Sequence, residues 1–230
     1  MASEQMVNAV GGVAGLATAG ITAERWAWRL GYRYIAGTDE AGRGALAGPL
    51  VAAAVILPAR GELEGLEGLT DSKQLSAEVR RRLFRQIVAV AVDWSFACIP
   101  PSQIDGGGLQ AANMAAMREA VLALEPAPGL VMVDYYRIEG LPIPQWGLAH
   151  GDAVCRSIAA ASILAKVIRD GLMWHWSLLY PQYGFDSNKG YGTEHHLKAL
   201  AAHGPSPCHR SSFHGVLQME MAWDGDGGAR

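Results

Sequence analysis

Four carboxylates stand at the ends of apolar or periodic segments of the chain. Asp39 and Glu40 follow a short β-prone run, and Asp134 follows the apolar run 130–133. Asp152 precedes a long helical stretch. Cleavage of a phosphodiester needs an activated water, a stabilised leaving group and a neutralised transition state, and two cations held by carboxylates supply all three. The four residues are therefore candidates for a Mg²⁺ or Mn²⁺ site.

Each of these residues also has an ordinary structural interpretation. Asp152 resembles a helix N-cap, and an aspartate such as Asp134 is common in the turn after a strand. Asp39 and Glu40 are more informative, because two adjacent acids at the end of an apolar strand repel each other. That repulsion favours a bound cation.

A glycine-rich loop comes directly after the acidic pair. Gly42, Arg43 and Gly44 could let the backbone approach a sugar closely, while the arginine neutralises a phosphate. Such a loop suits a protein that separates RNA from DNA by the 2′-hydroxyl. The alternative is an ordinary tight turn.

The sequence around the acidic pair resembles the signature of the ribonuclease HII family, which contains Asp-Glu-x-Gly-Arg-Gly. Further blocks similar to that family follow in the same order, so the resemblance covers most of the chain. The segments that carry it are 37–49, 69–76, 159–170, 180–184, 189–193 and 209–213.

The resemblance implies a fold and an activity. The fold would be a ribonuclease H-like α/β fold, with a mixed five-stranded sheet flanked by helices and a C-terminal helical extension. The enzyme would hydrolyse the RNA strand of RNA/DNA hybrids. It would also cut 5′ of single ribonucleotides in duplex DNA, leaving 3′-hydroxyl and 5′-phosphate ends, with Mg²⁺ or Mn²⁺ as cofactor.

The resemblance also assigns roles to individual residues. The metal ligands and catalytic residues would be Asp39, Glu40, Asp134 and Asp152. The ribonucleotide would be contacted by the loop Gly42, Arg43 and Gly44, and by Tyr191, which resembles a tyrosine that stacks near the RNA-to-DNA junction. Phosphates would be contacted by Ser72, Lys73 and Lys189, whose alternative is a solvated loop.

Two positions depart from the family pattern. The third aspartate is usually followed by glycine, but Asp134 is followed by Tyr135 and Tyr136. Either the backbone there does not need a positive φ, or the end of the strand is rearranged. A lysine usually precedes the Gly-Asp pair, and His150 stands in its place.

Secondary structure follows from periodicity and capping residues. Ser76 and Thr193 are predicted N-caps of two helices, and Gly204-Pro205 is the predicted stop of the second. The predicted strands are 34–38, 50–57, 94–99 and 130–133, and the predicted helices run from residue 76 to about 90, 109–124, 153 to about 180 and 193–202.

The domain organisation is read as one catalytic domain with extensions. We expect a partly disordered N-terminal extension over 1–30, a catalytic domain over 31–180, a C-terminal helical region over 181–222 and a disordered tail over 223–230. The chain has 230 residues, half of them hydrophobic, and a net charge of −3. This charge does not settle the partner, because a basic patch can be hidden in the average.

Three widely spaced cysteines suit a reduced, cytoplasmic compartment, and no segment is long and apolar enough for a membrane span. A monomer is expected. A sliding clamp is a candidate partner, although the tail contains no convincing docking peptide.

Three alternatives stay open. A DNA resolvase of the same superfold would use similar carboxylates without the glycine loop. A duplex-binding protein without activity is made conceivable by Tyr135 and Tyr136 beside Asp134. A zinc site would use the histidines and Cys208 between residues 195 and 214, although none of their spacings matches a known zinc motif.

Overall fold

The computed structural model describes residues 22–59, 66, 68–70, 72–135 and 137–216. Within this part, the chain divides into two compact units. The sheet unit comprises residues up to 41, 51–97 and 114–167, and the loop unit comprises 42–50, 98–113 and the residues from 168 onward. The predicted boundary at residue 180 differs, because the long helix is shared between the two units. The predicted tail over 223–230 lies outside the described residues.

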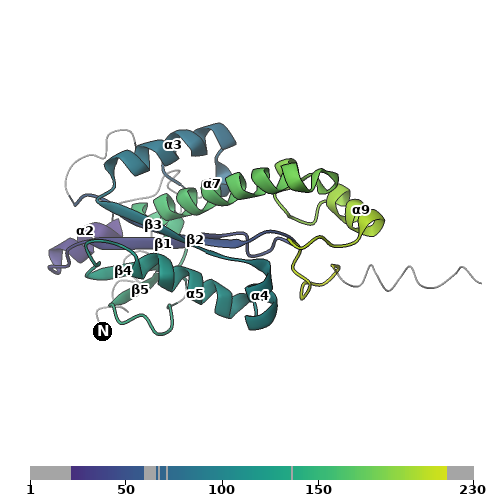
Figure 1. Cartoon of the computed structure of the whole chain (residues 1–230). Helices are drawn as coiled ribbons and strands as arrows, with labels where there is room; N and C mark the ends of the chain where they lie inside the picture. Colours follow the sequence, from purple (N-terminus) through teal and green to yellow (C-terminus); the bar gives the residue numbers. More distant parts are fainter. Residues whose placement is uncertain (1–21, 60–65, 67, 71, 136, 217–230) are drawn as a thin grey trace, which may run out of the picture. The chain divides into compact units, whose positions relative to one another are not determined.

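A mixed five-stranded sheet forms the centre of the sheet unit, which confirms the predicted fold class (Figure 1). Its strand order is β3-β2-β1-β4-β5, with β1 antiparallel to β2 and parallel to β4, and β4 parallel to β5. The strands are β1 (Ile35–Ala41), β2 (Leu50–Ile56), β3 (Asp93–Ile99), β4 (Leu130–Asp134) and β5 (Gln145–Leu148).

The middle of this sheet is covered on both faces. All seven residues of β2 and the first four of β1 and β4 are buried, as a continuous apolar run predicts. Gly37 in β1 marks the closest approach of a helix, since a Cβ there would lie 2.1 Å from the backbone carbon of Ser157. Only glycine fits at this position.

In the sheet unit, one predicted helix cap forms and one predicted long helix is divided. The Ser76 hydroxyl accepts a hydrogen bond from the amide of Val79, as expected of an N-cap. The predicted helix from residue 153 is instead two helices, because the backbone at Cys155 is extended. The helical elements are α2 (Thr22–Arg29), η1 (Ser72–Gln74), α3 (Ala77–Val90), α5 (Leu109–Leu122), α6 (Gly151–Val154) and α7 (Arg156–Leu179), of which α5 and α7 continue into the loop unit.

Helix α2 lies within the segment that sequence analysis placed in an N-terminal extension. Ala23 and Ala27 are fully buried and belong to one apolar cluster with Met132 of β4 and Ile158 of α7. Helix α2 therefore contributes Ala23 and Ala27 to the core of the sheet unit.

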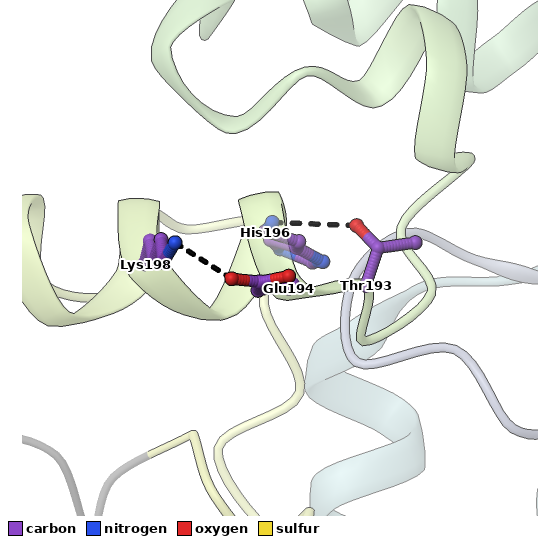
Figure 2. A network of polar contacts seen from close by, with 4 residues as sticks. All are labelled: Thr193, Glu194, His196 and Lys198. Atoms are coloured by element: carbon purple, nitrogen blue, oxygen red, sulfur yellow. Dashed lines mark hydrogen bonds and ion pairs between the residues drawn. The ribbon is translucent and has the colours of Figure 1, made fainter.

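The loop unit contains short helical elements and a second apolar cluster, which includes Met173, Tyr183 and Phe185. The elements are α4 (Pro101–Gly107), η2 (Pro181–Tyr183), α8 (Phe185–Asn188) and α9 (Glu194–His203). Thr193 caps α9 through the amide of His196 at 3.3 Å, and Lys198 pairs with Glu194 at 2.7 Å (Figure 2). Helix α9 ends at His203 with Gly204 as its C-cap, so both predicted caps are confirmed. No helix among the described residues is long and apolar enough to cross a membrane.

Candidate active site

Asp39 and Glu40 lie inside β1 rather than after it, because the strand continues to Ala41. Successive side chains of a strand leave on opposite faces, so the two carboxylates start on different sides of the sheet. Both residues are half-buried. The Asp39 Oδ1 atom accepts a hydrogen bond from the amide of Glu40 at 2.8 Å, which fixes its orientation.

A second contact connects Asp39 to the segment before α3. The Ser162 side chain of α7 hydrogen-bonds to Asp39, and its Oγ lies 2.8 Å from Ser72 Oγ. Ser72 is only 4% exposed, so its hydroxyl takes part in the hydrogen bonds around Asp39. Lys73, its neighbour in η1, is exposed. The predicted phosphate contacts thus differ in their access to a ligand.

The electrostatics of Asp39 identify its neighbours. Burial raises the pKa of this carboxyl well above its usual range, and the negative charges of Glu40 and then Asp134 raise that pKa further. Asp39, Glu40 and Asp134 therefore gather in one region of the sheet unit, as predicted from their strand positions.

Asp134 connects this group to the segment that carries Asp152. It is the last residue of β4, and its Oδ1 accepts a hydrogen bond from the amide of Gly151 at 2.8 Å. Asp152 follows in the first turn of α6. The prediction that Asp152 is an N-cap was wrong, since His150 holds that position in a left-handed conformation with φ of +56°.

The backbone conformation of Tyr135 tests one of the two explanations given for its departure from the family pattern. Its φ is +65°, so the backbone after Asp134 does adopt the conformation that favours glycine. The alternative in which no positive φ is needed was wrong. The side chain is 66% exposed. Tyr136 lies outside the described residues.

The case for a bound metal ion rests on which side chains are present, not on a metal site that is already formed. Among the described residues, no group of three or more His, Cys, Asp or Glu side chains is arranged to hold a metal ion. The Asp39 carboxyl, on which the charges of Glu40 and Asp134 act, nevertheless fits a hard divalent cation, which would neutralise these acids.

The three residues of the glycine loop have distinct surroundings in the loop unit. Gly42 has φ of +95°, and a Cβ there would lie 2.0 Å from Nε of Arg169, so packing alone demands glycine. A Cβ on Gly44 would meet nothing within 4 Å, and this residue is exposed. The Arg43 guanidinium donates to Oε1 of Gln110 at 3.2 Å.

Arg169 is a buried residue for which sequence analysis gave no role. It is 0% exposed and donates to the carbonyl oxygens of Pro49 at 3.0 Å, Lys189 at 2.9 Å and Ala47 at 3.1 Å. Its guanidinium carbon also lies 5.4 Å from the centre of the Tyr191 ring. One side chain thus holds the glycine loop segment and the Tyr191 segment together.

Arg210 is a second fully buried arginine beneath the same loop. It donates to the carbonyls of Gly48 at 3.0 Å and Arg43 at 2.9 Å. Burial, followed by the charge of Arg169, lowers the pKa of Arg210 to about 10. The burial of Arg169 has a signal in the sequence, because this arginine lies within an apolar helix pattern. Arg210 lies in no such pattern.

The two remaining predicted substrate contacts also lie in the loop unit. Lys189 is half-buried with φ of +53°, and its Nζ donates to the carbonyl of Asp186 at 2.5 Å. Tyr191 is 36% exposed, so part of its ring is available to a ligand. The structure therefore assigns the predicted carboxylates to the sheet unit, and Arg43, Lys189 and Tyr191 to the loop unit.

Comparisons with known proteins identify relatives of this chain in sequence and in fold. The family model of ribonuclease HII matches residues 36–216. A ribonuclease HII from Desulfitobacterium hafniense is 50% identical over 196 residues, which cover 85% of this chain and 74% of the relative.

Two solved structures have the same fold. The ribonuclease H2 of Pyrococcus horikoshii OT3 has a TM-score of 0.74 and 25% identity, covering 84% of this chain and 99% of that one. The RNase HII in a PCNA complex from Archaeoglobus fulgidus has a TM-score of 0.68 and 26% identity, covering 79% and 95%. The fold and these relatives define a nuclease of the ribonuclease H class. The chain belongs to the ribonuclease HII family.

Proposed function

We propose that this nuclease hydrolyses the RNA strand of RNA/DNA hybrids and cuts 5′ of single ribonucleotides embedded in duplex DNA. The products carry 3′-hydroxyl and 5′-phosphate ends. The single observation that carries the proposal is the gathering of negative charge around Asp39, whose segment is followed in the sequence by a loop that suits ribose recognition. Family membership supports the same activity.

The residues that would hold two Mg²⁺ or Mn²⁺ ions are Asp39, Glu40, Asp134 and Asp152. Such ions activate water and neutralise charge on the leaving group when they are bound. The chain's own contribution is orientation. Ser162 and the Glu40 amide fix Asp39, and the Gly151 amide fixes Asp134. These hydrogen bonds would fix the orientation of two of the carboxylates that would hold the cations.

The loop unit would recognise the ribonucleotide. Gly44 is open and lets the backbone approach the ribose, and Arg43 neutralises a phosphate. Tyr191, which is 36% exposed, would pack against the sugar or base at the RNA-to-DNA junction. Lys73 and Lys189 would contact phosphates. Ser72 is buried, so we propose that it supports Asp39 rather than touching the duplex.

The wider setting of the reaction is also a proposal. We expect a cytoplasmic, monomeric enzyme that removes misincorporated ribonucleotides and RNA left by replication. The relative crystallised with PCNA makes a sliding clamp the first partner to test.

Cleavage of matched duplexes tests the proposal. The substrates are a DNA duplex with one ribonucleotide, its all-DNA counterpart and an RNA/DNA hybrid, each with Mg²⁺ or Mn²⁺. The first and third should be cut and the second should stay intact. Asp39→Asn should abolish cleavage while metal-free binding to the hybrid survives. Cleavage of the all-DNA duplex would favour a resolvase, and binding without any cleavage would favour a non-catalytic protein.

A further inference from the structure

Two buried histidines meet in the loop unit, where no metal cluster is found among the described residues. His196 of α9 is 0% exposed, and His209 is 6% exposed. Their Nε2 atoms lie 2.9 Å apart. The Tyr183 ring packs edge-on against His209 with centroids 4.7 Å apart, and the Phe185 ring packs against His196 at 5.3 Å. The two imidazoles are therefore hydrogen-bonded to each other and enclosed by aromatic rings.

The two ends of this contact fix where the protons lie. The backbone amide of Ser206 lies 2.9 Å from Nδ1 of His209, and an amide can only donate. The His209 proton must then be on Nε2. At the other end, Nδ1 of His196 lies 2.9 Å from the carbonyl oxygen of Tyr191, which can only accept. The His196 proton is therefore on Nδ1, and its Nε2 accepts from His209.

The result is a hydrogen-bond chain with one direction, from the Ser206 amide through two neutral imidazoles to the Tyr191 carbonyl. The same carbonyl accepts the Thr193 amide at 2.8 Å. The Thr193 hydroxyl in turn accepts the backbone amide of His196, which fixes the start of α9 (Figure 2). Tyr191 is thus held at its carbonyl by His196 and at its ring by Arg169.

We propose that His196 and His209 are positioning residues for ribonucleotide recognition, which act by fixing the backbone of Tyr191. The proposal rests on the proposed function, in which Tyr191 contacts the ribonucleotide. Neither histidine touches the substrate. Their role requires both rings to be neutral, because a second proton on His196 would place two N–H donors face to face.

The surroundings of the pair favour the neutral rings. Burial lowers the pKa of His196, and burial together with His196 lowers the pKa of His209 to about 4. The titratable neighbours are His195 of α9, Tyr183 of η2, His203 against Tyr183, and Cys208, whose thiol pKa is raised to about 11 by burial. None of these neighbours supplies a negative charge at neutral pH that would favour protonation.

A matched pair of substitutions separates this role from simple packing. In His196→Asn the amide nitrogen occupies the place of Nδ1 and can still donate to the Tyr191 carbonyl. In His196→Gln the amide lies at the place of Nε2 and cannot. We expect His196→Gln to lower kcat/KM on the single-ribonucleotide duplex about tenfold, mostly through kcat, because phosphate contacts dominate binding. His196→Asn should stay within about threefold of the parent. Lys198→Ala on the same helix is the control.

Two further measurements make the outcome decisive. Nitrogen-15 NMR of the full-length protein should show the His209 proton on Nε2 and the His196 proton on Nδ1 at neutral pH. In a Tyr191→Ala background, the effect of His196→Gln should disappear, because the histidine acts through the tyrosine.

The proposal is overturned by the opposite tautomers, by equal losses in the Asn and Gln variants, or by a loss that persists without Tyr191. If the parent protein cuts no ribonucleotide-containing duplex, the proposed function fails instead. The NMR measurement still decides whether the hydrogen-bond chain exists.

Discussion

The two units differ in the charged side chains that they contain and in the groups that bind those side chains. In the sheet unit, the acids around Asp39 repel one another, and their partners are mostly backbone amides and hydroxyls. In the loop unit, Arg169 and Arg210 donate to backbone carbonyls, and His196 is kept neutral. The hydrogen bonds between strands fix the backbone of a sheet, so a sheet can contain charges that destabilise it. Loops lack these hydrogen bonds, so buried side chains must donate to their carbonyl oxygens and hold them in place.

The largest expected effect concerns the repulsion in the sheet unit. Asp39→Asn should lower the cleavage rate on the order of 10³-fold, because it removes a proposed metal ligand. The same change should raise the metal-free stability by about 1 kcal/mol, since one of the repelling charges is gone. Urea unfolding with and without Mg²⁺ measures the second effect.

In the parent protein, Mg²⁺ should raise the free energy of unfolding, and Asp39→Asn should reduce that gain. A variant less stable than the parent in the absence of metal would contradict the repulsion.

The next effect concerns the hydrogen bonds that hold the loop unit. Arg169→Met should lower the free energy of unfolding by about 4 kcal/mol, because three buried carbonyls lose their donor. Arg81→Met on α3, at an exposed position, is the matched control and should change stability by less than about 0.5 kcal/mol. Equal effects in the two variants would show that the carbonyl contacts contribute nothing.

A third effect follows from the low pKa of His209. The unfolded chain binds a proton on this residue below about pH 6.5, whereas the folded chain does so only near pH 4. The unfolded state therefore binds more protons in this window, and stability decreases as the pH falls through it, by about 3 kcal/mol in total. Below pH 4 this residue adds no further loss.

Urea unfolding at pH 7, 5.5 and 4 checks the slope. His209→Gln cannot titrate, so its stability should depend less on pH over this range. An identical slope in both proteins would exclude His209 as the source.

The smallest effect concerns the strained residue beside the carboxylates. Tyr135→Gly should raise stability by about 1 kcal/mol, because glycine adopts a φ of +65° without strain and the tyrosine ring is mostly exposed. Tyr135→Phe keeps the strain and should lack this gain. Thermal unfolding compares the three proteins, and a destabilised glycine variant would mean that the ring makes contacts that outweigh the strain.

Much of the fold was predictable because the relevant signals are local. Ser76 and Thr193 are capping residues immediately before their helices, and both caps form as predicted. Strand β5 was not predicted from its own residues, because Gln145–Leu148 is short, contains a glycine and is only partly buried. Its pairing with β4 provides what the local pattern lacks.

The residues of the candidate site also divide into those with a local sequence signal and those without one. Asp39, Glu40 and Asp134 could be found from their strand positions and the family motif. The reason for Gly42 could not, because it depends on Arg169, a residue 127 positions further along the chain. Sequence reasoning assigned this glycine to sugar approach, whereas the structure gives it a packing partner. Long-range packing of this kind leaves no periodic trace.

Helix α2 affects where a shortened version of this protein can begin. The Glu24 carboxylate accepts hydrogen bonds from the amide of Ser157 at 2.9 Å and its hydroxyl at 3.0 Å, at the first turn of α7. A chain starting at residue 31 would leave that turn without its acceptor and uncover Ile158. The segment that looks expendable in the sequence thus determines how the longest helix begins.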